Sequence, residues 1–282
     1  MINDLNKKTN VKVIAEIGIN HNASIDLCKK MIQLSKLAGC DYVKIQKRNP
    51  DVCVPENQKE KRRNTPWGEM SYLEYKHRIE FNENQIKDLA QFCKKEEIGF
   101  FASVWDIDSV NIMSKYCDIG KIGSPCITDL ELCKAAREAF DFLIISTGMS
   151  TEKEIEECVE ACNPDVIMHT NSTYPCPPEE LNLRYIEHLK NKWGDKKEIG
   201  YSGHEEGIYC SLATIGMGVS WIERHITLDK KMWGSDHLAS LAPIELFELV
   251  KGVREIEKSM KYKPLPRIVR ESEKIKKESL RK

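Results

Sequence analysis

The sequence contains no long apolar run. Its longest uninterrupted apolar stretches have about four residues, such as Phe142 to Ile145, whereas a membrane-spanning helix needs ~20. The first ten residues are polar and lack the hydrophobic segment of a secretory signal. We therefore expect a cytoplasmic protein with neither a membrane span nor a secretory signal.

The sequence also has almost no net charge and no Cys-x-x-Cys pair. Its 43 Lys and Arg residues nearly balance its 44 Asp and Glu residues, so no overall field attracts nucleic acid or an anionic membrane, and any anion must bind locally. Eleven cysteines are scattered from Cys28 to Cys210. Because many of them (Cys28, Cys93, Cys133, Cys158) fall within helix or strand patterns, we interpret them as buried, reduced thiols rather than disulfides or zinc ligands.

Glycine and proline are also sparse, and the composition is that of a globular protein. With 15 glycines, 11 prolines and 41% apolar residues, the chain can bury a sizeable core and is neither disordered nor fibrous. Its 282 residues suit a closed eight-fold α/β barrel, which usually has ~250 residues. We predict an α/β fold, a single-domain (β/α)8 TIM barrel over residues 11–262.

Eight strand-like runs alternate with eight amphipathic helix patterns, as expected for a parallel sheet. Asn82, Asp129 and Thr151 are expected helix N-caps. The expected strands are Val11 to Ile17, Asp41 to Gln46, Gly99 to Val104, Ile119 to Ile122, Phe142 to Ser146, Val166 to Asn171, Glu198 to Tyr201 and Ser220 to His225. The expected helices lie near 24–38, 83–96, 107–116, 129–139, 151–161, 179–191, 206–217 and 243–261.

Three segments depart from this alternation. Residues 1–10 form a polar N-terminal extension, and residues 263–282 form a charged tail with the composition of a solvated helix or linker. Residues 47–82 form a long connection after the second strand. Because long connections in compact domains are more often functional than idle, we expect this one to cover the active site.

Polar residues follow the expected strands at one end, where barrel active sites lie. A single serine at a strand end is more often a turn or helix cap than a ligand. Five serines at five different strand ends are harder to explain in that way; they are Ser103, Ser124, Ser146, Ser172 and Ser202. Lys44 and Lys121 lie within apolar strands, where an unpaired inward ammonium is costly to desolvate. We favour a phosphate site over paired core lysines.

Two histidines, His204 and His225, end adjacent strands. Either one alone is more often a packed or capping residue, but together they could bind a divalent metal that polarises a carbonyl oxygen. Glu16 is a candidate general base or ligand of a sugar hydroxyl, and Asp236 is either a second such acid or a turn residue. His169 and Trp221 are interpreted as core residues.

The motifs resemble the sialic acid synthase (N-acetylneuraminate synthase) family. They are residues 15–21 (AEIGINH), 43–47 (VKIQK), 121–124 (KIGS), 146–149 (STGM), 174–175 (YP), 200–205 (GYSGHE) and 222–229 (IERHITLD) through 234–240 (GSDHLAS). The similarity runs in register from about residue 11 to about residue 250. Residues 67–68 and 74–81 of the long connection are similar to the animal-type synthases.

The resemblance implies a transferase that condenses phosphoenolpyruvate with the open-chain aldehyde of an N-acylhexosamine. The products would be phosphate and a nonulosonic acid for surface polysaccharide, with cleavage of the C–O bond. Phosphoenolpyruvate would contact Lys44, Lys121, Ser124, Ser146 and Ser202, to which strand-end position adds Ser103 and Ser172. Glu16, Asn20, Tyr174 and Asp236 would contact the acceptor, and His204 and His225 would bind Mn²⁺ or Mg²⁺. Glu16, His204, Lys44 and Lys121 are the expected catalytic residues, and a homodimer is expected.

Three departures from the family pattern limit this assignment. Cys126 stands where the family usually has an acid, and a thiol cannot move a proton at neutral pH without a lowered pKa. Val104 stands where many members have a threonine that contacts phosphate. Many members also continue into a C-terminal antifreeze-like domain that donates an arginine to the partner's sugar site, so we expect the long connection or another chain to complete the acceptor pocket.

Two alternatives remain beside this interpretation. The first is a phosphoenolpyruvate-dependent synthase of a 3-deoxy-ulosonic acid that uses a different sugar aldehyde, which Cys126 favours. The second is a non-catalytic relative that binds a sugar or phosphate. Retention of both lysines and both histidines argues against the second, because a relic should lose expensive buried charges.

Overall fold

The computed structural model describes residues 11–261 and 266–281 and contains a closed barrel of eight parallel strands. The strands are β1 (Lys12–Gly18), β2 (Tyr42–Lys47), β5 (Gly99–Val104), β6 (Ile119–Ile122), β7 (Phe142–Ser146), β8 (Val166–His169), β9 (Glu198–Gly203) and β10 (Trp221–His225). Their order around the barrel is β1-β10-β9-β8-β7-β6-β5-β2. The predicted TIM barrel is confirmed.

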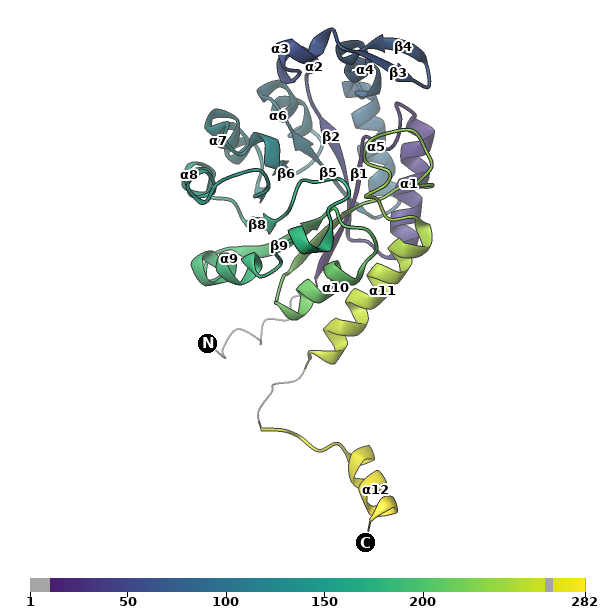
Figure 1. Ribbon diagram of the computed structural model, residues 1–282, viewed down its shortest axis with the longest axis vertical. Helices are drawn as coiled ribbons and strands as arrows, with labels where there is room; N and C mark the ends of the chain where they lie inside the picture. The colour runs from purple at the N-terminus through teal and green to yellow at the C-terminus, as the bar shows by residue number, and fades with distance from the viewer. Residues whose placement is uncertain (1–10, 262–265, 282) are drawn as a thin grey trace.

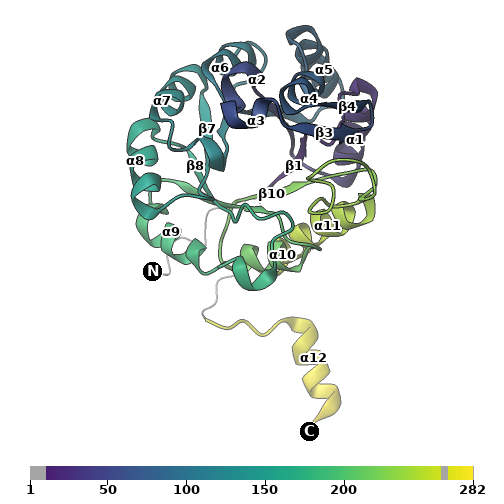
Figure 2. The same cartoon turned by 45° about the horizontal axis from the view of Figure 1, so that its top comes forward.

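Helices surround the barrel on the outside (Figure 2). They are α1 (Ile25–Ala38), α5 (Glu83–Lys95), α6 (Ile107–Met113), α7 (Leu130–Ala139), α8 (Glu152–Cys162), α9 (Tyr185–Trp193), α10 (Tyr209–Gly216) and α11 (Pro243–Ser259). The three expected N-caps are confirmed, since the Asn82, Asp129 and Thr151 side chains each accept a hydrogen bond from the backbone three residues later. None of the helices described is long and apolar enough to cross a membrane.

Several predicted boundaries were wrong. Strand β8 ends at His169 rather than Asn171, and β9 continues to Gly203 rather than ending at Tyr201. The single helix expected over 179–191 is a 3-10 turn (Pro178–Glu180) followed by α9, because Asn182 adopts a left-handed backbone with φ of 46°. Likewise α10 begins at Tyr209 and not near 206, after Gly207 with φ of 72°.

The long connection after β2 contains regular structure of its own. It forms α2 (Pro50–Cys53), α3 (Glu56–Lys59), a hairpin of β3 (Arg62–Thr65) and β4 (Gly68–Ser71), and α4 (Tyr72–Ile79). We call residues 50–79 the cover. Tyr75 and Ile79 of the cover pack on Ile19, which follows β1, and Tyr75 also contacts Trp233, which follows β10. The cover therefore lies against the loops of one barrel end (Figure 1).

Parts of both terminal segments fall outside the residues that the structure describes. The predicted extension over residues 1–10 falls outside the described residues, as do 262–265 and 282 of the predicted tail. The described part of the tail forms α12 (Glu271–Leu280), which lies apart from the barrel with its side chains exposed (Figure 1).

The cysteines are free thiols throughout the part of the chain that the structure describes. The burial expected for Cys28, Cys93, Cys133 and Cys158 is confirmed. The Sγ atoms of Cys133, Cys158 and Cys162 lie within 4.8 Å of one another, between the neighbouring helices α7 and α8.

A fully buried ion pair fastens β10 to the segment after β9. The Arg224 guanidinium lies 3.1 Å from the Glu205 carboxylate and donates to Ser211 and to the Gly207 carbonyl. Each partner is at most 1% exposed. Breaking such a pair leaves a charge buried without compensation.

Replacing this arginine should destabilise the barrel strongly. We expect Arg224→Met to lower the free energy of unfolding by about 3–5 kcal/mol, because Glu205 loses its counter-ion in the interior. Urea unfolding measures the change. Arg184→Met, which removes the exposed pair with Glu187, is the matched control and should change little. Equal unfolding midpoints for the two variants would contradict the expectation.

Candidate active site

Side chains inside the barrel lie in two layers, because alternate residues of each strand point to the same side. The lower layer is apolar and contains Ile14, Phe101, Ile144, Val166, Met168 and Trp221. The inward positions above this layer carry polar side chains that are all at most 4% exposed. They are Glu16, Lys44, Ser103, Lys121, Ser146, Ser202, Glu223 and His225. A polar layer therefore rests on an apolar floor at the end where barrel active sites lie.

The centre of the polar layer is the Glu223 carboxylate. Its Oε1 lies 2.8 Å from Lys121 Nζ and 3.0 Å from Lys44 Nζ, and Ser202 donates a hydrogen bond to the same oxygen. Lys44 also lies 3.3 Å from Glu16 and donates to Ser103. The predicted residues Glu16, Lys44, Ser103, Lys121 and Ser202 therefore belong to one network.

The network separates the pKa values of its members. Burial, together with the Glu223 charge, raises the pKa of Glu16 to about 7 in spite of Lys44. Burial opposes the ionisation of Glu223, but Lys121 and Lys44 hold the pKa of this carboxyl well below its usual range. Burial lowers the pKa of Lys121 to about 8. Glu16 and Lys121 can thus gain or lose a proton near neutral pH.

Sequence reasoning missed Glu223. A detectable signal existed, because Glu223 lies two residues before His225 on the same strand and must share its inward side. Two inward lysines also require a carboxylate nearby. Gln46, two residues after Lys44, is a second omission of this kind, and its amide lies 3.5 Å from Glu16 Oε1.

Hydroxyl groups converge beside Lys121 at the ends of β6, β7 and β8. The Gly148 amide donates to Ser124 Oγ, and the buried Ser146 hydroxyl has no hydrogen-bond partner among the described residues. A Cβ on Gly148 would lie 2.4 Å from Ser172 Oγ and 2.9 Å from Ser124 Oγ. Because Gly148 has no side chain, the Ser124 and Ser172 hydroxyls both approach its backbone closely and form a hydroxyl cluster of the kind that accepts phosphate oxygens.

The two histidines face each other across the same end of the barrel. Their ring centroids are 5.4 Å apart. His204 Nδ1 is engaged by the Asn171 carbonyl at 2.6 Å, which leaves Nε2 free to bind a metal. His225 Nδ1 is buried without a hydrogen-bond partner and lies 4.0 Å from Asp236. Burial lowers the pKa of His204 to about 3 and that of His225 to about 4, so both imidazoles are neutral.

The predicted acceptor residues differ in their exposure and in their distance from the histidine pair. Tyr174 packs against His204 with ring centroids 4.0 Å apart and the rings tilted by 32°, and it is 42% exposed, so it borders the site opening. Asp236 lies beside His225, as described. Asn20 is buried, and its amide donates to the Ile226 carbonyl and to Ser240, which ties two rim loops together. Its Oδ1 is the atom without a partner in the described structure.

The remaining residues singled out in the sequence are buried. His169 donates to the Leu181 carbonyl and packs on aromatic rings, and Trp221 joins the apolar floor, so both core assignments are confirmed. Val104 is fully buried at the end of β5. Cys126 is buried in a 3-10 turn after β6, and burial raises the pKa of its thiol to about 12.

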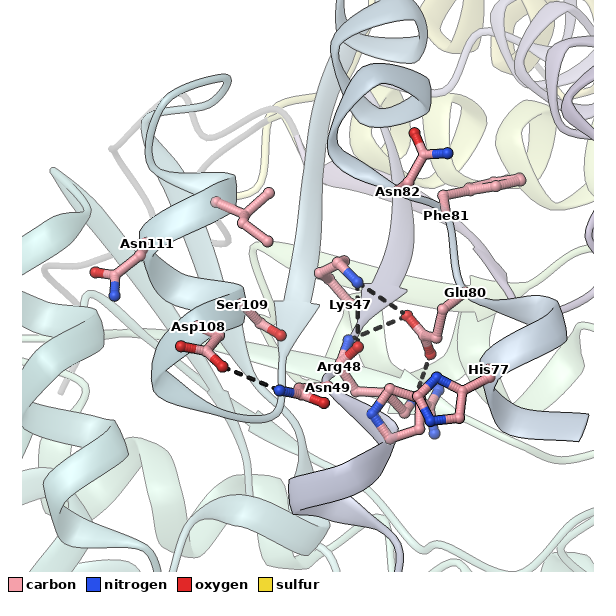
Figure 3. A pocket seen from close by; sticks show the side chains of 12 residues that line it. Lys47, Arg48, Asn49, His77, Glu80, Phe81, Asn82, Asp108, Ser109 and Asn111 are labelled. Atoms are coloured by element: carbon pink, nitrogen blue, oxygen red, sulfur yellow. Dashed lines mark hydrogen bonds and ion pairs between the residues drawn. The ribbon is translucent and has the colours of Figure 1, made fainter. Parts of the chain in front are cut away.

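A second polar cluster lies beside the rim and was not predicted. Figure 3 shows Lys47, the last residue of β2, and the adjacent Arg48 directed at Glu80. Arg48 lies 2.7 Å from the Glu80 carboxylate, and Lys47 lies 3.5 Å from it. The adjoining cavity of about 500 Å³ is also lined by Asn49, His77, Asp108 and Asn111, outside the barrel axis. Its charges are largely paired within the cluster.

Comparison with known proteins places the chain among synthases. Residues 31–264 match the NeuB family. The N,N'-diacetyllegionaminic acid synthase of Campylobacter jejuni is 35% identical over 88% of this chain and 77% of its own length, and the human N-acetylneuraminate-9-phosphate synthase is 36% identical over 88% and 70%. The N-acetylneuraminic acid synthetase structure from Leptospira borgpetersenii superposes with a TM-score of 0.85 at 29% identity, covering 97% of this chain and 93% of that one.

Replacing Glu16 should remove a pH dependence of stability. Folded Glu16 keeps its proton to about pH 7, whereas an unfolded glutamate loses it near pH 4.5, so the unfolded state binds fewer protons in that window. The stability of the natural protein should therefore fall by about 1.4 kcal/mol per pH unit there relative to Glu16→Gln. Urea unfolding between about pH 5 and about pH 7 measures the difference.

Glu160→Gln, on the exposed side of α8, is the control. Its free energy of unfolding should change with pH in the same way as that of the natural protein. If the free energy of unfolding of Glu16→Gln also followed that of the natural protein between about pH 5 and about pH 7, folded Glu16 would not hold a proton in this pH range.

Proposed function

The chain belongs to the NeuB family of sialic acid synthases, and from this premise we propose that it condenses phosphoenolpyruvate with the open-chain aldehyde of an N-acylhexosamine. The products are a nonulosonic acid and inorganic phosphate. The observation that carries the proposal is the pair of buried lysines held on Glu223, together with the hydroxyl cluster around Gly148. Two cations and several hydroxyls beside one another suit the phosphate and carboxylate of phosphoenolpyruvate.

The residues of the polar layer divide the work of the reaction. Lys121, Ser124 and Ser146 bind the phosphate, and Lys44 with Ser103 and Ser202 orients the enol. C3 of phosphoenolpyruvate attacks the aldehyde carbon, and the aldehyde oxygen takes a proton to become a hydroxyl. Glu16, with a pKa near neutral, is suited to hold that proton. Water then adds at C2, and the tetrahedral intermediate loses phosphate by C–O cleavage.

The histidine pair fits a divalent metal. His204 Nε2 and the His225 imidazole offer two nitrogen donors, and both imidazoles are neutral and therefore able to coordinate. Mn²⁺ or Mg²⁺ bound there would polarise the aldehyde as a Lewis acid. Tyr174, packed against His204, lies on this side of the site.

A synthase acting on another sugar aldehyde is the second candidate, and Cys126 is the observation that favours it. With its pKa raised to about 12, the thiol is neutral and cannot replace a carboxylate in proton transfer.

The free thiols of the chain fit a reducing cytoplasm as the place of action. The homodimer stays a prediction, which light scattering of the purified protein measures.

Phosphate release from phosphoenolpyruvate tests the proposal. The purified protein should release phosphate with an N-acylhexosamine in the presence of Mn²⁺, and a chelator should abolish the release reversibly. Lys121→Met should lower kcat/KM for phosphoenolpyruvate on the order of 100-fold, because a charged phosphate contact is lost. Lys87→Met, on the exposed side of α5, is the control. Release with only other aldehydes would favour the second candidate, and no release with any aldehyde would reject both.

Removing the thiol distinguishes a catalytic Cys126 from a spectator. We expect Cys126→Ala to keep kcat within about fivefold of the natural value, since a neutral thiol transfers no proton at pH 7. Steady-state kinetics with the preferred aldehyde provides the measurement. A drop on the order of 100-fold with unchanged thermal stability would show that the reaction uses this thiol.

A further inference from the structure

Three cysteine thiols converge between α7 and α8, two helices that pack side by side on the outside of the barrel (Figure 2). Cys158 and Cys162 lie four residues apart on α8 and share one face of that helix, and Cys133 approaches them from α7. Among the residues that the structure describes, this is the one place where three His, Cys, Asp or Glu side chains bring ligand atoms within 4.8 Å of one another. The two helices thus present a group of potential metal ligands.

The spacing of the sulfur atoms fits a metal ion between them. Sγ of Cys158 lies 3.7 Å from Sγ of Cys133 and 3.9 Å from Sγ of Cys162. An ion equidistant from three atoms spaced in this way would lie roughly 2.1–2.5 Å from each, and a metal–thiolate bond is ~2.3 Å long for Zn²⁺. The three side chains can therefore coordinate an ion without a rearrangement of either helix.

The thiols have only weak hydrogen bonds to lose. Cys133 Sγ lies 3.9 Å from the Cys126 carbonyl and 3.7 Å from the Ile127 carbonyl, and Cys162 donates to the Cys158 carbonyl within its own helix. A thiol is a weak donor, so replacing its proton by a metal ion costs little hydrogen bonding. A buried cysteine that serves only as a small apolar residue needs no other sulfur beside it. The convergence of three sulfurs is therefore the feature that indicates a ligand.

The number of ligands and their burial favour Cu(I) over Zn²⁺. Structural Zn²⁺ almost always has four ligands, and among the described residues no fourth His, Cys, Asp or Glu side chain joins the three cysteines at this spacing. Each of the three is 0% exposed, so open solvent does not supply a water ligand. Soft thiolates select Cu(I), and this ion needs no more than three of them.

Positive charge near the cluster offsets part of the negative charge of a thiolate site. Three thiolates exceed the charge of one Cu(I) ion, and an uncompensated buried charge is costly. Arg137, one turn after Cys133 on α7, and Lys197 both favour a negative charge at Cys162. Arg137 also pairs with Asp165 at 2.7 Å, so the compensation is partial.

We propose that Cys133, Cys158 and Cys162 bind one Cu(I) ion, which joins α7 to α8 and is separate from the metal proposed at the histidine pair. Each thiol coordinates as a thiolate and releases its proton to solvent. Because the ion binds the folded arrangement and not the unfolded chain, it stabilises the fold. The site lies outside the barrel, so this inference does not depend on the proposed reaction.

The copper content of the purified protein tests the proposal. The full chain, produced in cells supplied with copper and purified anaerobically in reducing buffer, should contain about one copper ion per chain by elemental mass spectrometry. X-ray absorption at the copper edge should show sulfur ligands, whereas copper at the histidine pair would show nitrogen. Cys158→Ala should lower the copper content about tenfold or more. Cys40→Ala, which removes a buried thiol outside the cluster, is the matched control and should keep its copper.

Thermal unfolding provides a second measurement. Bound copper should raise the unfolding midpoint of the natural protein and of Cys40→Ala, and it should leave that of Cys158→Ala unchanged. Copper that has nitrogen ligands and is retained by Cys158→Ala would overturn the inference, as would Zn²⁺ at the cysteines in place of copper. A metal-free cluster in the natural protein would do the same. If Cys158→Ala does not fold, Cys162→Ala and the sulfur signature of the natural protein decide the question.

Discussion

The interaction on which the rest of the site depends is the contact of the Glu223 carboxylate with two lysines. Lys44 and Lys121 come from strands that are not neighbours of β10, and each reaches Glu223 across the barrel interior at 3.0 Å or less. Without this carboxylate, two ammonium groups would lie close together in a region of low dielectric, at a prohibitive desolvation cost. Glu223 therefore allows the barrel to keep cations where an anionic substrate needs them.

The barrel architecture creates the conditions for this contact. Strand alternation places an apolar layer below and a polar layer above, so the charged groups lie on a packed floor that excludes water. The same desolvation that makes the charges costly brings the pKa values of Glu16 and Lys121 toward neutrality. One structural feature thus places buried cations beside groups whose pKa values lie near neutrality.

The cover, residues 50–79, places a further buried cation at the open end of the barrel. Its aromatic residues pack on Ile19 and Trp233, which fixes α4 against the loops after β1 and β10. That packing buries the Lys76 stem beside tyrosine rings and leaves its charge uncompensated. The inner layer and the cover therefore present cations at two levels of the same barrel end.

The sequence by itself determined the barrel, because eight strand and helix patterns with N-caps at Asn82, Asp129 and Thr151 are local properties of the chain. It also determined which strand ends carry Glu16, the lysines, the serines and the histidines. Tertiary structure alone decided that Glu223 joins Lys44 to Lys121 and that the segment 50–79 folds into helices and a hairpin. It also decided that Lys76 has no carboxylate within 4.0 Å among the described residues. Spacing could indicate that Glu223 shares the inward side of its strand with His225, but the distances that join residues far apart in the chain cannot be read from spacing or periodicity.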